Sequence, residues 1–309
     1  IFYIIFLTFP YNLLYHLIGE YMKNIFKILL IFIFTLLIFF KRNIIVLSTI
    51  ESIELFNKSL FPSIFPIMIL SDFILSTNFI NILSKTIGKV FSKIFNLNNI
   101  SIYPFFMSSI CGSPSNAKYI NDLLTNNYIN KTEAIKLLSM CNLFNPLLII
   151  SLTKYLNLKD SIIIIILNIF INLIIGLINR NIKIETLNKN FISKKFNLVN
   201  SIANSLNTLI SIFGIVTFFN IINNLLPIKH PLITGIFEIT NGLNLINKIN
   251  ITYKYKLIYT AILMGFSGLS IITQIKSIFN KENTLNFSLF FKSRIIHLIL
   301  FIILIYILY

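Results

Sequence analysis

Long apolar runs are the feature that most constrains how this 309-residue chain folds. A helix needs about 20 mainly apolar residues to cross a bilayer, and charged residues make up only 12% of this chain, whereas soluble domains carry about 25%. Backbone polar groups in lipid must be paired within the protein. We therefore predict an all-α, polytopic membrane protein and exclude a soluble enzyme, a secreted disulfide scaffold and a disordered chain. The candidate spanning runs are 25–40, 59–76, 133–153, 161–179, 203–226 and 289–309.

The positive charges indicate how the chain is oriented. Lys and Arg number 26 against 10 Asp and Glu, a net charge of +16. On a soluble protein this excess would suggest nucleic acid; in a membrane protein it marks cytoplasmic loops, so we expect no nucleic-acid partner. The most basic loop, 180–195, is placed in the cytoplasm. Segment 79–96 carries Lys85, Lys89 and Lys93 on one helical face, which predicts an amphipathic helix in the membrane interface on the same side.

Two apolar segments are interrupted by small residues. Gly112–Ser115 interrupts 101–122, and Ser267–Ser270 interrupts 255–280. In the first interruption, Ser113 is predicted to cap a half-helix whose first helical residue is Pro114. The free N–H groups and positive dipole end of that half-helix favour an anion.

Similar interruptions in both halves of the chain suggest an internal repeat. If both interrupted segments are hairpins, the helices that lead the two halves, 59–76 and 209–226, point in opposite directions. The sequence then predicts two inverted repeats, as in many secondary transporters. Whether 101–122, 232–247 and 255–280 span the membrane or re-enter it stays open at this point.

These features divide the chain into five parts. The first is separate because Pro10 and His16 interrupt its apolar run. No basic segment precedes this run and no small-residue cleavage site follows it, so we expect no cleaved signal peptide. The parts are an N-terminal segment (1–24), a leading transmembrane helix (25–45), a first repeat (46–153), a transmembrane helix with a basic cytoplasmic linker (154–200), and a second repeat with a C-terminal transmembrane helix (201–309).

Polar residues in or near the interruptions are the candidate binding groups, because polar groups inside a membrane usually face a cavity or a partner. For the acids Asp72 and Glu238, the structural alternative is a membrane-edge position or a pair with Lys118. Helix breaks are predicted at Pro62, Pro66, Pro114 and Pro146, with Asn142 and Asn145 satisfying groups freed beside Pro146. The predicted solute-binding residues are Gly112, Ser113, Ser115, Asn116, Lys118, Glu238, Asn241, Ser267, Gly268 and Gln274.

The sequence holds no pattern that indicates catalysis, a metal or a cofactor. His16, His230 and His297 lack metal-ligand spacing, and Cys111 and Cys141 form no CxxC pair. No close pair of carboxylates suggests acid–base chemistry. We therefore expect a protein that is not an enzyme and has neither metal nor cofactor.

Four stretches of the chain resemble a known family. They are similar to sporulation integral membrane proteins of the YlbJ type, which contain two nucleoside-recognition Gate domains; the terminal Arg294-x-x-His297 also matches. The chain departs from the pattern at Asp72, Cys111, Ser113 and Asn116. The matching stretches are SLFPSIFPIMILSDFIL (59–75), SICGSPSNAKYINDLLTNNYINKTEAIKLLSMCNLFNP (109–146), GIFEITNGL (235–243) and FSGLSIITQI (266–275).

The resemblance implies a multi-pass protein of a forespore or mother-cell membrane that is needed for spore cortex formation. Together with the interrupted segments, it predicts a transporter-like permease for a small polar or anionic solute, with the lipid bilayer and other spore-envelope membrane proteins as partners. Two other hypotheses stay open. One is a non-transporting scaffold for cortex assembly, in which small residues serve helix packing; the other is an ion or nucleoside permease outside sporulation.

Overall fold

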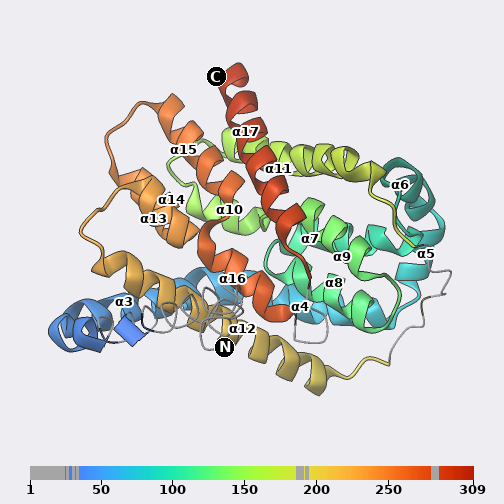
Figure 1. Cartoon of the computed structure of the whole chain (residues 1–309), viewed down its shortest axis with the longest axis horizontal. Helices are drawn as coiled ribbons and strands as arrows, with labels where there is room; N and C mark the ends of the chain where they lie inside the picture. Colours follow the sequence, from blue (N-terminus) through green and yellow to red (C-terminus); the bar gives the residue numbers. More distant parts are fainter. Residues whose placement is uncertain are drawn as a thin grey trace, which may run out of the picture. The chain divides into compact units, whose positions relative to one another are not determined.

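A computed structural model of the chain describes residues 25, 28–29, 32, 35–185, 191, 195–279 and 285–309. Within these residues the structure is helical and has no strand, as predicted (Figure 1). The chain divides into two units, residues 1–48 and 49–309. All predicted binding residues belong to the second unit. The predictions for 1–24 lie outside the described residues.

The described part contains five helical stretches that are long and apolar enough to cross a membrane. Four of the predicted runs, 59–76, 161–179, 203–226 and 289–309, fall largely within them and are confirmed. The first stretch joins α3 (Arg42–Leu55), a π-helical turn (Phe56–Leu60) and α4 (Phe61–Ser76), with Pro66 inside α4. The five stretches are Arg42–Ser76, Leu158–Asn181, Leu198–Leu225, Tyr253–Ile278 and Ser288–Leu308.

The candidate run 133–153 is not a single spanning helix, and it is divided just before Pro146, where a helix break was predicted. The chain forms α9 (Lys131–Met140) and α10 (Pro146–Leu152), and residues 141–145 between them are not helical. Proline has no N–H to donate and favours the first position of a helix. Asn145 accepts hydrogen bonds from the backbone N–H groups of Leu147 and Leu148, so it caps a new helix at this point.

Two of the open segments are helical hairpins. In the first, α7 (Ile102–Cys111) is followed by α8 (Ser115–Thr125), and the rings of Tyr103 and Tyr119 lie 5.8 Å apart across the pair. In the second, α13 (Pro231–Phe237) is followed by α14 (Ile239–Lys248). A methyl group on Gly242 would lie 2.6 Å from the Cα of Gly235, so only glycine permits this close approach.

The third open segment is an interrupted helix. α15 (Tyr253–Phe266) and α16 (Gly268–Ile278) are separated by Ser267 alone, and together they form one candidate span. The structure therefore does not pair the two interruptions as the sequence suggested. By element order, the hairpin α7–α8 corresponds to the hairpin α13–α14, and the interrupted helix α9–α10 corresponds to α15–α16.

The same order of helix types thus occurs twice in the chain. Each half has a leading helix, a hairpin, an interrupted helix and an uninterrupted helix. In the first half these are α4, α7–α8, α9–α10 and α11 (Leu158–Ile178); in the second they are α12 (Leu198–Leu225), α13–α14, α15–α16 and α17 (Ser288–Leu308). The first half also contains α5 (Phe79–Lys85), α6 (Ile87–Phe95) and a short turn at Asn99–Ser101.

The amphipathic character predicted for 79–96 is confirmed, although Thr86 divides this segment into α5 and α6. Phe91 and Phe95 are buried against the protein, whereas Lys89 and Lys93 are exposed. The end of α6 is attached to the start of the basic linker. The ammonium group of Lys136 donates to the backbone oxygens of Asn96, Arg180 and Ile182, at 2.9, 3.1 and 3.3 Å.

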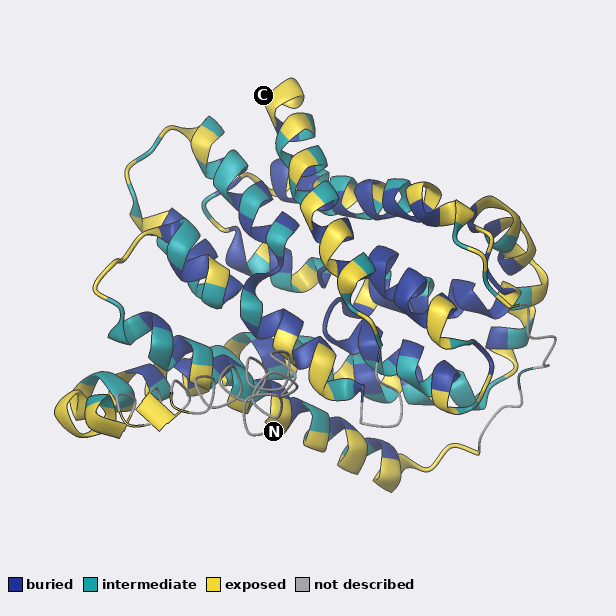
Figure 2. Cartoon of the chain, viewed as in Figure 1, coloured by how far each residue is buried: buried dark blue, intermediate teal, exposed yellow. Residues whose placement is uncertain are grey.

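Loops from the two halves of the chain lie at opposite ends of α11. Its 21 residues extend about 30 Å. Asn96 and Arg180 lie at its C-terminal end, whereas Tyr253 lies at its N-terminal end, where its hydroxyl donates to the carboxylate of Asp160. The buried core lies mainly among α7, α8, α9, α11, α15 and α17, and a smaller apolar cluster joins α4 to α12 (Figure 2).

Candidate functional site

The interruption between α7 and α8 packs directly on the interruption between α9 and α10. Gly112 has a φ of +72°, and a methyl group here would lie 2.2 Å from the backbone nitrogen of Asn145. The next residue, Ser113, donates its backbone N–H to the Leu143 oxygen at 2.7 Å. A glycine with positive φ is therefore needed to bring these two backbone segments into contact.

The predicted capping role of Ser113 is wrong. The helix begins at Ser115, after Pro114, and no side chain caps it. The Ser113 hydroxyl instead donates to Oδ1 of Asn142 at 2.5 Å. The helix start is also less available to an anion than predicted, because the N–H groups of Asn116 and Ala117 already donate to backbone oxygens.

Asn142 connects three interruptions. Its Oδ1 accepts from Ser113, and its Nδ2 donates to the hydroxyl of Ser267 at 2.8 Å, in the interruption between α15 and α16. A further hydrogen bond joins α8 to the interruption between α9 and α10: Nδ2 of Asn116 donates to the Cys141 oxygen at 2.9 Å. One buried amide therefore links the first half of the chain to the second.

The interruption between α13 and α14 completes the arrangement. A methyl group on Gly268 would lie 3.2 Å from the Gly235 oxygen and 3.4 Å from the Ile239 nitrogen, so these backbones are in contact. Glu238 caps α14, accepting from the Asn241 N–H at 2.9 Å and from the Thr240 hydroxyl. All four helix interruptions therefore meet in one region.

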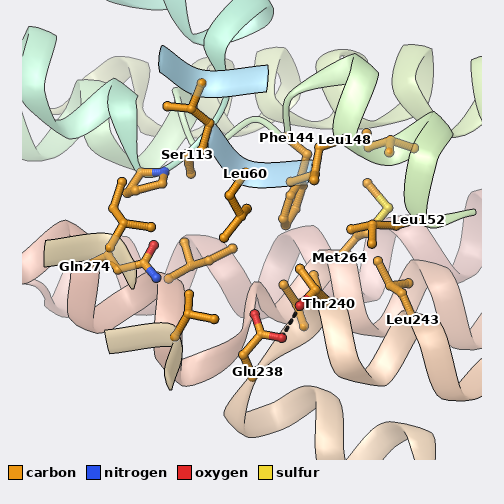
Figure 3. A pocket seen from close by; sticks show the side chains of 17 residues that line it. Leu60, Ser113, Phe144, Leu148, Leu152, Glu238, Thr240, Leu243, Met264 and Gln274 are labelled. Carbon is orange, nitrogen blue, oxygen red and sulfur yellow. Dashed lines mark hydrogen bonds between the residues drawn. The ribbon is translucent and has the colours of Figure 1, made fainter. Parts of the chain in front are cut away.

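A cavity of about 40 Å³ lies at this meeting point (Figure 3). Residues from α4 and α12, including Ile64 and Ile212, close it with apolar surface. The carboxylate of Glu238 and the carboxamide of Gln274 are its strongest polar groups, and these residues are only 1% and 3% exposed. The volume suits water or one small polar group. This region is called the inner cavity below; its polar lining also includes Ser113 and Thr240.

Lys118 does not reach the inner cavity. Its ammonium group lies 3.1 Å from Oδ1 of Asp72, and Oδ2 of Asp72 accepts from the Ser201 hydroxyl at 2.8 Å. A structural pair with Lys118 was the alternative to a solute-binding role for Asp72, and the structure contains that pair. The pair joins α8 to α4 and lines an open polar cavity of about 270 Å³.

The predicted binding residues fall into three groups. Ser113, Glu238 and Gln274 line the inner cavity. Lys118 pairs with Asp72, and the Asn241 side chain points to α12, where it donates to Asn220 at 2.7 Å. The remainder hold the interruptions together or are buried beside them: Gly112, Ser115, Asn116, Ser267 and Gly268.

The most important residue that the sequence did not single out as a site residue is Arg294 of α17. Its guanidinium is 2% exposed and donates to the Ser139 oxygen at 2.9 Å and to Oδ1 of Asn172 at 3.0 Å. It also reaches the Asn142 oxygen at 3.4 Å. Arg294 thus satisfies carbonyl groups left free where α9 ends. The available signal was a basic residue within an apolar run.

Glu133 was also missed as a buried group. Its carboxylate accepts from the backbone N–H of Asn98 and from the Ser101 hydroxyl, both at 2.6 Å. It therefore fixes the turn that precedes α7. Local sequence gives no sign of this contact, because the two partners lie more than 30 residues away in the chain. The two cysteines are buried free thiols, and the described residues contain no group of three His, Cys, Asp or Glu side chains.

Comparison with known proteins supports the resemblance seen in the sequence. The chain is similar to the sporulation integral membrane protein YlbJ of Bacillus subtilis strain 168, with 22% identity over 76% of this chain and 70% of that protein. An integral membrane relative and five candidate spans lead to the same assignment. The chain is a multi-pass membrane protein. No protein-family profile and no solved structure matches it.

Proposed function

We propose that this chain is a sporulation membrane protein that acts as a permease for a small polar solute. The observation that carries the proposal is the convergence of four helix interruptions around the inner cavity. Non-helical backbone at membrane depth is tolerated where it is buried in protein or lines a cavity, and transporters place such interruptions at their binding sites. Glu238 and Gln274 would bind the solute or a coupling ion there.

Two Gate-like repeats in inverted orientation are part of this proposal. Support comes from the order of helix types, which is the same in both halves. It also comes from the loops, since Asn96 and Tyr253 lie at opposite ends of α11. Two halves of opposite orientation around one site would allow access to alternate between the two sides of the membrane.

The role in spore cortex formation rests on the resemblance. The relative's name identifies it as a sporulation integral membrane protein. Of the motif residues, Gly112 and Glu238 lie at helix interruptions and Gln274 lines the inner cavity. The chain would then act in a forespore or mother-cell membrane, and other spore-envelope membrane proteins are its expected partners. The solute would be one that cortex assembly requires on the other side of that membrane.

Solute flux in reconstituted vesicles tests the permease proposal. Glu238→Gln is expected to lower flux at least tenfold, because the amide cannot carry the charge of a buried carboxylate. Glu54→Gln is the matched control: its carboxylate is 60% exposed and pairs with Lys58 at the surface, and flux should be unchanged. Equal flux for Glu238→Gln and the intact chain would exclude a role for Glu238.

Lys118→Ala addresses the second charged position. It should lower flux by leaving Asp72 partly buried without its cation, and Asp72→Asn in the same chain should restore much of the loss. Lack of rescue would indicate that Lys118 itself contacts the solute.

A non-transporting scaffold is the second candidate. The close packing of Gly235 on Gly242 favours it, since small motif residues then serve helix contact, as that hypothesis requires. The scaffold predicts no flux for any solute, normal sporulation in Glu238→Gln and cross-links to cortex-assembly proteins during sporulation.

A further inference from the structure

One face of α12 is polar although the helix is a candidate membrane span. Asn200, Asn204, Asn207 and Ser211 are spaced by four, three and four residues, which places them on one side of the helix. All four are exposed. Among the described residues, the side chains of Asn204 and Asn207 make no hydrogen bond. Amide groups facing lipid would be costly, so this polar stripe must face water or protein.

The polar stripe lines two open cavities. The first, of about 270 Å³, is the one that contains the Asp72–Lys118 pair; the second has about 420 Å³. Lys118, Asp122 and Asn204 line both cavities, so the two are adjacent. They are together called the vestibule.

The vestibule leads to the inner cavity. Gln274 of α16 and Ile212 of α12 line both the larger vestibule cavity and the inner cavity. The combined volume lies in the range of small-molecule sites, about 300–1,000 Å³. The larger vestibule cavity therefore adjoins the inner cavity, with Gln274 between them.

The charges of the vestibule cancel. The smaller cavity is lined by two carboxylates, Asp72 and Asp122, and by two ammonium groups, Lys118 and Lys195. The charged residues that line the larger cavity are Asp122 and Lys118. The 3.1 Å contact with Asp72 further neutralises Lys118. Apart from Asp122, and Lys195 in the smaller cavity, the groups that face a ligand are mainly amides and hydroxyls, which both donate and accept hydrogen bonds.

We propose that the vestibule binds an uncharged, hydroxyl-rich solute and passes it to the inner cavity. This inference rests on the proposed permease function and narrows its substrate from polar or anionic solutes to uncharged ones. A hydroxyl group donates and accepts, so it matches the amide side chains of Asn204 and Asn207. The Ser211 oxygen, whose hydrogen is donated to the Asn207 backbone oxygen, can accept from it. A carboxylate or phosphate accepts only, and it would find no unpaired cation in the larger cavity.

Cysteine labelling tests the vestibule without depending on transport. Ser211 and Ile210 are neighbours, both exposed, and point about 100° apart on the helix. Ser211→Cys should react with a membrane-impermeant maleimide at least tenfold faster than Ile210→Cys, because only position 211 faces the vestibule. The native Cys111 and Cys141 are 2% and 0% exposed and should not interfere.

Protection from labelling tests the substrate class. The uncharged polyol ribitol should slow the labelling of Asn207→Cys severalfold, whereas the anion ribonate at the same concentration should leave it unchanged. Asn247→Cys on α14, which is exposed and lines neither cavity, should be insensitive to both. Protection by ribonate alone, or by neither solute, would overturn the uncharged class.

The outcomes separate this inference from the permease proposal. Failure of Ser211→Cys to react would mean that protein, such as a second copy of the chain, covers the polar stripe, and the vestibule assignment would be wrong. Protection by ribitol without ribitol flux in vesicles would keep the binding site and overturn the permease. Flux of ribonate but not of ribitol would keep the permease and overturn the inference.

Discussion

At the scale of single residues, the geometry of the site depends on backbone positions where a side chain does not fit. Gly112 combines a positive φ with contact to the backbone of Asn145. An alanine here must adopt a left-handed conformation and also displace Asn145, which holds the start of α10. The whole first interruption therefore depends on the absence of one methyl group.

Gly112→Ala should destabilise the protein by about 1–3 kcal/mol, the usual cost of overpacking, and lower its melting temperature in detergent. Gly214→Ala is the matched control. Gly214 lies within α12, and no atom lies within 4 Å of the added methyl group. Alanine there should be neutral or stabilising by up to about 1 kcal/mol. Equal melting temperatures for both variants would show that the close contact at Gly112 is not a constraint.

The residue scale also shows what sequence can and cannot predict. Asn145 followed by Pro146 is a local signal: Asn145 was predicted to satisfy backbone groups freed beside Pro146, and in the structure it does so by capping α10. Ser113 followed by Pro114 is an equally good local signal for a cap, but the prediction was wrong. The hydroxyl partner of Ser113 is Asn142, which is 29 residues away, and no local pattern contains that information.

At the scale of elements, apolar length predicted the uninterrupted helices and not the interrupted ones. Residues 133–153 are apolar enough for a span, yet they form α9 and α10. Residues 255–280 were identified as interrupted because Ser267 and Gly268 stand out in an apolar run. At 133–153 the sequence predicted a break at Pro146 but not the non-helical residues 141–145 before it. These residues are mixed polar and apolar, and Arg294, which satisfies the free carbonyls here, comes from a distant helix.

Loop accessibility tests the orientation of the elements. Lys89 of α6 and Lys183 of the linker belong to the end of the molecule where Lys136 joins the two segments, whereas Asn250 precedes Tyr253 at the opposite end. An impermeant thiol reagent added outside intact cells should label Asn250→Cys and leave Lys89→Cys unlabelled. Lys183→Cys, the same-side control, should behave like Lys89→Cys. Labelling of Asn250→Cys and Lys89→Cys from the same side would contradict the inverted arrangement.

At the scale of the whole molecule, the convergence of all four interruptions was the least predictable feature. The sequence indicated the interruptions at Gly112–Ser115 and Ser267–Ser270 and a break at Pro146, and it paired the first two as equivalent positions. In the structure a hairpin of one half packs on the interrupted helix of the same half, and the two interrupted helices meet through Asn142 and Ser267. Such contacts depend on how helices pack, which composition and periodicity do not specify.

The Asn142 link predicts energetic coupling between the halves. Ser113→Ala and Ser267→Ala each leave one polar atom of Asn142 buried and unsatisfied, which costs about 1–3 kcal/mol. In the double variant Asn142 is free of both partners and can turn to other groups. The combined loss should therefore be smaller than the sum of the single losses by at least about 0.5 kcal/mol, measured by unfolding in detergent.

The control pair is Ser161→Ala with Ser113→Ala. Ser161 bonds to Thr153 at the N-terminal end of α11, so the losses of this pair should be additive. Additivity for Ser113 and Ser267 as well would mean that the halves meet at the site without being coupled through Asn142, and a permease that moves one half against the other would need a different connection.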